Sequence, residues 1–191
     1  MYLFFDTETN GLPKTEIING KPTKVYPRVI QLAYILLNDN FEEVQSYCEL
    51  IYPDGWEIPN DRFWIENGYS TEQNKLKGVN IRVALNFFSQ AIDQCHTMVA
   101  HNIAFDTPVL VSEMQRYKIS ANNKNSKKIC TMLSTIDFCK LPSQRGGFKW
   151  PKLIELHEKL FGVGFDGAHD ALEDVRATVR CFIELRNRNI I

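Results

Sequence analysis

The sequence lacks an apolar run long enough to cross a membrane, and its first residues lack a secretory pattern. The longest apolar run is VIQLAYILL, residues 29–37, and Gln31 interrupts it. A membrane-spanning helix needs about 20 apolar residues. The N-terminus has neither the basic region nor the small-residue cleavage site of an exported chain. We therefore expect a cytoplasmic protein that makes no use of a membrane.

Paired cysteine motifs are also missing. The chain has five cysteines, an odd number, and none of them forms a CxxC pair. Neither the cysteines nor the histidines cluster at the spacing of zinc ligands. This usage favours reduced cysteines, most of them in the core, over a disulfide framework or a zinc site. The cysteines are Cys48, Cys95, Cys130, Cys139 and Cys181.

A strong excess of one charge is absent as well. The net charge is −1, which argues against a general nucleic-acid coat. The basic residues are nevertheless unevenly spread, because residues 116–152 contain a single acid, Asp137. That segment is either a solvated face or a surface that follows the phosphates of a nucleic acid. Its basic residues are Arg116, Lys118, Lys124, Lys127, Lys128, Lys140, Arg145, Lys149 and Lys152.

The chain has the size of one domain, residues 1–191, with enough length to bury about 70% of its unfolded surface. Apolar or alternating segments predict strands at residues 2–5, 28–37 and 42–52, which we expect to form an antiparallel meander. Residues 10–24 are rich in turn formers and predict a loop, or a hairpin with Asn19-Gly20 at its tip. Residues 53–80 contain several prolines and glycines and are expected to be irregular.

The second half alternates strands and helices. Pro108 is expected near the first turn of its helix and Pro151 near the start of another, where a missing N–H costs little. Asp170 and Glu173 predict a capping box at the start of the last helix. The fold class is therefore α/β, a mixed sheet with helices on its faces. The predicted elements are a helix at 82–92, a strand at 97–100, a helix at 102–119, a strand leading into a helix at 127–138, and helices at 150–162 and after Asp170.

The stretch FFDTETNG, residues 4–11, carries two acids two positions apart. Side chains at positions i and i+2 of a strand point to the same face. A strand that continues through this stretch therefore projects Asp6 and Glu8 together. Two neighbouring carboxylates repel each other unless a cation lies between them, and hard divalent ions such as Mg²⁺ prefer such oxygen ligands. The alternative is that the strand ends at Asp6 and both acids face solvent.

Two further acids and one histidine stand near the starts of predicted helices. Asp106 follows HNIAF, and it either serves the same site or only complements the helix dipole. Asp174 borders the buried stripe of the last helix and has no basic residue at i±4. A metal would offset the cost of burying such an acid. His169 precedes the capping residue, so it is either a general base beside the acids or a surface histidine.

These residues together resemble the DEDDh family of 3′–5′ exonucleases, which includes the proofreading epsilon subunit of bacterial replicative DNA polymerases. FFDTETNGL matches the first motif of that family, HNIAFD the second, and HDALED, with the pattern HxAxxD, the third. The resemblance extends over residues 1–185. It implies a ribonuclease H-like fold, two bound Mg²⁺ or Mn²⁺ ions, and removal of nucleoside 5′-monophosphates from the 3′ ends of single-stranded nucleic acid, with DNA favoured.

The resemblance also implies roles for individual residues. Asp6 would bridge both ions, Glu8 and Asp174 would complete the site of the ion that carries the attacking water, and Asp106 would support the second ion through water. All four would be catalytic, with His169 as the general base. A DNA polymerase is the implied protein partner. The implied substrate-binding residues are Thr7, Thr9, Gly11, Leu12, His101 and Asn102.

Two stretches depart from the pattern of that family. Asn10 stands where many members have threonine. Residues 66–73, ENGYSTEQ, only loosely resemble the nucleotide-contacting HGIT stretch, with Asn67 where histidine is common. The aromatic residues nearby either stack on bases or pack in the core. They are Trp56, Phe63, Trp64 and Tyr69.

Two other function classes stay open. FFDTET is also similar to the strand end of haloacid-dehalogenase phosphatases, which have DxD there. Glu8 is one methylene longer than the second aspartate of that motif, and HxAxxD has no role in that chemistry. The other class is a nuclease-like fold that binds nucleic acid or a polymerase without cutting, although all five catalytic positions are filled.

Overall fold

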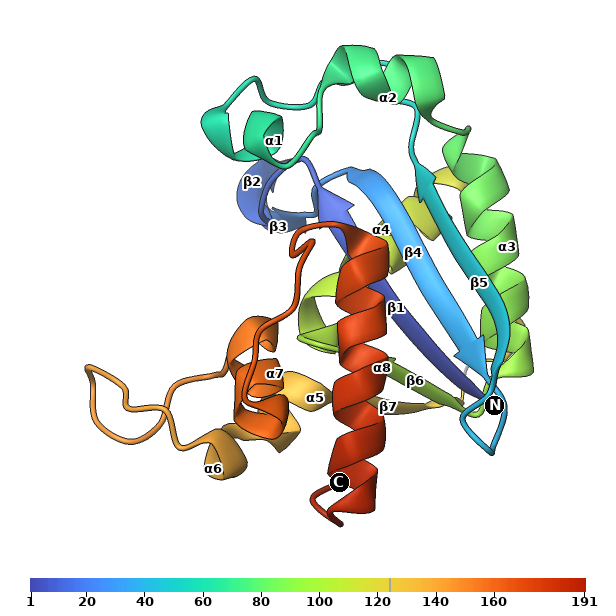
Figure 1. The fold of residues 1–191 in the computed structure, drawn as a ribbon. Helices are drawn as coiled ribbons and strands as arrows, with labels where there is room; N and C mark the ends of the chain where they lie inside the picture. Colours follow the sequence, from blue (N-terminus) through green and yellow to red (C-terminus); the bar gives the residue numbers. More distant parts are fainter. Residues whose placement is uncertain (124) are drawn as a thin grey trace.

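The computed structural model describes residues 1–123 and 125–191, and a five-stranded mixed sheet forms its centre (Figure 1). The strand order is β5-β4-β1-β6-β7. β4 pairs antiparallel with β1 and β5, whereas β6 runs parallel to β1 and β7. The predicted meander and mixed sheet are therefore confirmed. The strands are β1 (Tyr2–Thr9), β4 (Val29–Leu37), β5 (Glu43–Leu50), β6 (Thr97–Ala100) and β7 (Lys127–Cys130).

The apolar start of β1 fills two cores, one on each face of the sheet. Leu3 and Phe5 lie in the core beneath α3 and α4, and Phe4 lies in the core beneath α8. This division follows from the alternation of side chains along a strand. It explains why the YLFF segment has no polar position. The three helices are α3 (Ile81–Gln94), α4 (Ile103–Tyr117) and α8 (Ala171–Asn187).

A hairpin projects beyond the end of β1, as one of the two sequence readings of residues 10–24 predicts. It consists of β2 (Lys14–Ile18) and β3 (Lys21–Val25), paired antiparallel. Asn19 and Gly20 form its tip with φ values of 52° and 73°. Asn-Gly suits two consecutive left-handed positions, which is the geometry of a type I′ turn.

The last third of the chain adds short helices that pack against α8. Leu156 and Leu160 bury themselves beside Cys181 and Leu185 of α8. The helix predicted at 150–162 begins later than expected, because Lys152 is its N-cap and Pro151 precedes the cap. The elements of this group are α5 (Thr131–Ser134), α6 (Ile136–Cys139) and α7 (Leu153–Phe161).

The expectation that residues 53–80 are irregular is wrong, because two helices form there. They are α1 (Arg62–Glu66) and α2 (Thr71–Lys77). The Ser70 hydroxyl accepts a hydrogen bond from Gln73 N at 3.1 Å and thereby caps α2. Buried Asn74 donates to two strand-end carbonyls and fastens α2 to the sheet. The Ser-x-x-Gln pattern at residues 70–73 is a capping signal that the expectation of an irregular segment overlooked.

Two details at the helix ends also differ from expectation. Pro108 is the sixth residue of α4, so it lies beyond the first turn. Asp170 caps α8 by accepting from Leu172 N and Glu173 N, but the Glu173 carboxylate pairs with Arg176. The cap is therefore confirmed, and the reciprocal half of the capping box is not present.

The cysteines agree with the expectation of reduced, mostly buried thiols. All five cysteines are free, and all except Cys48 are buried. Within the described ranges, no helix combines the length and apolar character that a membrane crossing requires.

Candidate metal centre and active site

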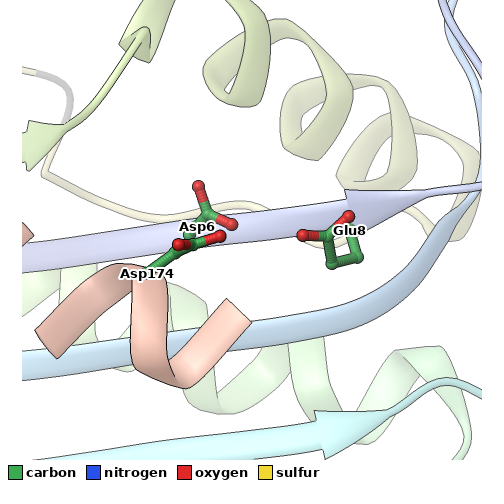
Figure 2. A group of neighbouring side chains, drawn as sticks. All are labelled: Asp6, Glu8 and Asp174. Carbon is green, nitrogen blue, oxygen red and sulfur yellow. The ribbon is translucent and has the colours of Figure 1, made fainter. Parts of the chain in front are cut away.

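Three carboxylates meet where the second half of β1 passes the first turn of α8. Asp6 and Glu8 lie on the same face of β1, and Asp174 reaches them from α8 (Figure 2). Each side chain offers an oxygen, and these oxygens all lie within 4.8 Å of one another. The strand therefore continues through both acids, and the alternative in which it ends at Asp6 is wrong.

Two helices bring an acid to β1 in the same way. Asp106 is the fourth residue of α4, and Asp174 is the fourth residue of α8. The N-terminus of a helix carries partial positive charge, which favours anionic side chains there. The two helices cover opposite faces of the sheet, so their first turns approach the same strand from both sides (Figure 1).

Asp106 stands apart from the other three acids. It is only 3% exposed, and its Oδ1 accepts hydrogen bonds from the Thr7 hydroxyl at 2.7 Å and from Thr7 N at 3.2 Å. The group of mutually close ligand atoms contains Asp6, Glu8 and Asp174 without Asp106. The charge of Asp106 nevertheless raises the pKa of Asp6 and of Glu8.

Burial and neighbouring negative charges hold the pKa values of the four acids high. The pKa of Asp6 lies well above its usual value because of burial first, and then because of the charges of Asp106 and Asp174. Burial and the charge of Asp174 raise the pKa of Glu8 to about 8. Burial also raises the pKa of Asp106 to about 7 and that of Asp174 to about 6.

The described residues provide no basic partner for the acidic cluster. In the described part of the chain, no ion pair involves any of the four acids. Closely spaced carboxylates of this kind ionise together only when a cation neutralises them. Oxygen ligands suit Mg²⁺ or Mn²⁺, and Asp6, Glu8 and Asp174 fit such an ion by type and spacing.

His169 lies directly beside this cluster. Its N–H donates to Asp174 Oδ2 at 3.2 Å, and its backbone has a left-handed φ of 73°. Its ring is exposed and packs edge-on against Phe63 of α1, with 5.3 Å between ring centroids. The loop position expected from the sequence is thus confirmed, and the imidazole is exposed to solvent.

Two residues beneath His169 were missed by the sequence reasoning. In the sequence, Gln31 was noted only as an interruption of an apolar run. In the structure it donates to Asp170 Oδ2 at 3.0 Å and accepts from Ala171 N at 2.9 Å. Tyr69 was considered for base stacking or core packing, but not as a partner of the His169 loop. It is buried, and its hydroxyl lies next to Gln31 and the His169 carbonyl. A polar residue inside VIQLAYILL was the available signal, because a buried amide requires partners.

The other residues expected to bind substrate occupy two places. The Thr9 hydroxyl donates to Gly11 O at 2.7 Å and holds the loop after β1, which leaves Leu12 79% exposed. Asn102 caps α4 in a left-handed conformation with φ of 74°. Contact between these residues and a substrate stays a prediction.

His101 is enclosed by protein groups. Its ring nitrogens lie 3.0 Å from Thr131 Oγ1 and 3.0 Å from Pro151 O, and burial lowers its pKa to about 4. These bonds fix Pro151, and the loop before it, near the first turn of α4. The predicted contact of His101 with substrate likewise stays a prediction.

The basic segment divides between two ends of the sheet. Lys124 lies outside the described residues. Lys127 aligns with Thr97, which aligns with Tyr2, so it lies about 13 Å short of Asp6 along the strands. This placement favours the solvated-face reading for Lys127 and the neighbouring Lys128.

A second aromatic and basic stretch lies closer to the site and was not singled out from the sequence. Phe148 is 45% exposed and Trp150 is 64% exposed, and Lys149 lies between them. The three residues line a hollow of about 370 Å³. Pro151, next in the chain, is bonded to His101, so this stretch stands at the end of the sheet where α4 begins.

The comparisons with known proteins agree with this geometry. Residues 3–182 match the family model described as exonuclease, RNase T. Escherichia coli Exonuclease I in complex with a dT13 oligonucleotide superposes with a TM-score of 0.75 at 19% identity, covering 98% of this chain and 41% of that one. The same protein with a dA16 oligonucleotide gives a TM-score of 0.71 at 18% identity, covering 99% and 41%.

The likeness to Exonuclease I shows that the ribonuclease H-like fold predicted from the sequence is correct. This chain spans about two fifths of the length of those Exonuclease I chains. No curated protein sequence matches it. The family match covers nearly the whole chain and includes all three acidic motifs. The chain therefore belongs to the RNase T exonuclease family, a family of hydrolytic nucleases.

Proposed function

We propose that this protein is a metal-dependent 3′–5′ exonuclease that releases nucleoside 5′-monophosphates from the 3′ ends of single-stranded nucleic acid, with DNA favoured. The observation that supports this most is the meeting of Asp6, Glu8 and Asp174 within 4.8 Å, beside exposed His169 and away from any basic partner in the described residues. A phosphodiester is itself anionic, so hydrolysis at this cluster requires cations.

Two divalent ions would supply that charge, align a water for in-line attack and stabilise the leaving 3′ oxygen. Asp6, Glu8 and Asp174 would hold them, and Asp106, fixed by Thr7, would support the second ion. Asp174 also orients His169 through the backbone of that residue. The imidazole would accept the proton of the attacking water, which requires it to be neutral.

The surroundings of the site offer surfaces for a single strand. Leu12 and Phe63 are exposed apolar side chains at the end of β1 and beside His169. Phe148 and Trp150 extend this surface on the α4 side, and Lys149, which pairs with Glu155, lies between them in the chain. Aromatic faces stack on bases of any sequence, while cations follow the phosphates. This combination favours a strand bound with little base specificity.

The decisive experiment supplies 5′-labelled single-stranded DNA and RNA of the same sequence with Mg²⁺, and separates the products. A ladder that shortens from the 3′ end, with release of nucleoside 5′-monophosphates, is the expected outcome. EDTA should abolish it, and Asp6→Asn should lack it. Binding without shortening would favour the non-catalytic module. Turnover of a small phosphomonoester such as p-nitrophenyl phosphate in place of the oligonucleotide would favour the phosphatase reading.

A further inference from the structure

The hydroxyl of Tyr69 connects strand β4 to the loop that carries His169. Tyr69 is only 4% exposed, and its oxygen lies 2.5 Å from Gln31 Oε1 and 2.8 Å from the carbonyl oxygen of His169. The connection is long-range in sequence, because Tyr69 precedes His169 by 100 residues. The two residues are nevertheless in direct contact through this hydrogen bond.

The bonding around Gln31 fixes the direction of these contacts. Its amide nitrogen faces the carboxylate of Asp170, and its Oε1 accepts from Ala171 N. Oε1 is therefore an acceptor, as is the His169 carbonyl, so the single hydroxyl proton of Tyr69 is shared between two acceptors. Burial raises the pKa of Tyr69 further above neutrality, so that proton stays in place.

The backbone of His169 is consequently held on both sides. Its N–H donates to Asp174 Oδ2, and its carbonyl accepts from Tyr69. Its φ of 73° is a conformation that residues other than glycine adopt at a cost, and that persists only where surrounding contacts enforce it. Phe63 contacts the ring itself. The two hydrogen bonds thus fix the backbone of His169, from which the imidazole extends. The contact with Phe63 limits the rotation of the imidazole ring.

We propose that Tyr69 is a positioning residue for His169: its hydroxyl holds the loop so that the imidazole faces the attacking water at the carboxylate cluster. This inference rests on the proposed function. It goes beyond that function by assigning a role to a side chain that touches neither the substrate nor the cluster. The proposed role belongs to the hydroxyl and not to the ring, because a phenylalanine ring would fill the same buried space.

The test is Tyr69→Phe, assayed on single-stranded DNA with Mg²⁺. One neutral hydrogen bond is worth about 0.5–1.5 kcal/mol, which converts to a fall in kcat of roughly 2- to 10-fold. KM for the oligonucleotide and the affinity for Mn²⁺, measured by calorimetry, should stay within twofold. In EDTA, the amides of residues 165–170 should exchange with deuterium faster than in the wild type, a readout that does not depend on activity.

A double-mutant cycle separates positioning from general weakening. In a His169→Ala background, Tyr69→Phe should lower kcat no further, because no imidazole is left to position. An equal fall in both backgrounds would overturn the proposal, and so would a Tyr69→Phe protein with wild-type kcat. If the wild-type protein never shortens DNA, the proposed function is refuted. The deuterium-exchange result would then still show whether Tyr69 holds the His169 loop.

A matched control is available on the other face of the sheet. Tyr34 is equally buried, and its hydroxyl accepts a 2.8 Å hydrogen bond from Gln45. Tyr34→Phe should cost similar stability but leave kcat unchanged. Should Tyr69→Phe fail to fold, Gln31→Met provides the second variant, since it removes one acceptor that orients the hydroxyl. Its fall in kcat must then disappear in the His169→Ala background, or the proposal is wrong.

Discussion

Thr7 and Asp106 are joined by two hydrogen bonds, because the hydroxyl and the N–H of Thr7 both donate to Oδ1 of the carboxylate. The pair connects the middle of β1 to the first turn of α4. The resemblance to DEDDh exonucleases implies that Thr7 touches substrate, whereas the bonds in the structure give it a partner inside the protein. These two roles lead to different outcomes when the hydroxyl is removed.

Thr7→Val should weaken divalent-cation binding more than substrate binding. The hydroxyl lowers the pKa of Asp106, so its loss should leave that acid more protonated near neutral pH. A hydrogen bond to a charged group is worth about 1.5–3 kcal/mol, and we expect Mn²⁺ affinity to fall roughly tenfold or more. Calorimetric titration at pH 7 measures this, with Thr7→Ser as the control that keeps the hydroxyl. An unchanged cation affinity with a raised KM for the oligonucleotide would instead show that Thr7 contacts the nucleic acid.

Asp6→Asn should abolish cleavage and stabilise the metal-free protein. The change removes an acid that the metal-free native state must either keep protonated or hold charged beside Glu8 and Asp174. The melting temperature in EDTA should therefore rise, while added Mg²⁺ should no longer raise it. Asp54→Asn removes an exposed charge elsewhere and should do neither. A cleaving Asp6→Asn variant would refute the assignment of Asp6 as a ligand.

In EDTA, the free energy of unfolding should decrease as pH rises from about 4 to about 8. The cluster acids have native pKa values above their ordinary ones, and that of Glu8 is about 8, so the native state binds more protons than the unfolded state. Stability from these groups is present below the ordinary pKa and is lost as pH passes the native pKa. Urea titrations across this pH range measure the slope, which saturating Mg²⁺ should flatten. A rise in stability with pH in EDTA would contradict the electrostatic description.

His169→Ala should keep folding, Mn²⁺ affinity and oligonucleotide binding but lose about 10²–10⁴-fold in kcat. The imidazole does not belong to the group of ligand atoms, since only its backbone N–H reaches Asp174. Steady-state kinetics on single-stranded DNA, calorimetric titration with Mn²⁺ and fluorescence anisotropy in EDTA measure the three properties. A variant within a few-fold of wild type would make His169 a structural loop residue.

Trp150→Ala should weaken binding of single-stranded DNA, because stacking on an aromatic ring is worth about 1–3 kcal/mol per base. Leu76→Ala, an apolar change at a still more exposed position in α2, is the control. Neutralising Lys127 and Lys128 should leave the salt dependence of binding unchanged, since they lie at the far end of β7. If the log–log salt slope instead becomes flatter by roughly 0.7 per lost contact, these lysines contact the phosphates of the nucleic acid. Fluorescence anisotropy in EDTA over a salt series measures both effects.

The sequence predicted the sheet and the acidic cluster well because both depend on short-range patterns. Alternation along β1 places Asp6 and Glu8 together, and the cap at Asp170 places Asp174 one turn into α8. The contacts that orient the site depend instead on segments distant in the chain. Nothing near Gln31 in the sequence indicates that it bonds to Tyr69 and to the start of α8.

The aromatic residues show the same limit. The four considered from the sequence include Tyr69, which is buried, and Trp64, whose indole N–H donates to Thr9 O. Phe148 and Trp150 are exposed, yet the local pattern gave them no distinction. Exposure is a property of tertiary packing, so composition alone cannot separate a stacking surface from a core.

The site draws Asp6 from the first strand and Asp174 from the last helix, and α8 also covers the sheet face that contains Phe4. During synthesis, the set of carboxylates stays incomplete and the Phe4 face of the sheet stays uncovered until α8 has left the ribosome. Domains generally fold as units, so we expect the complete acidic site to form only when α8 docks.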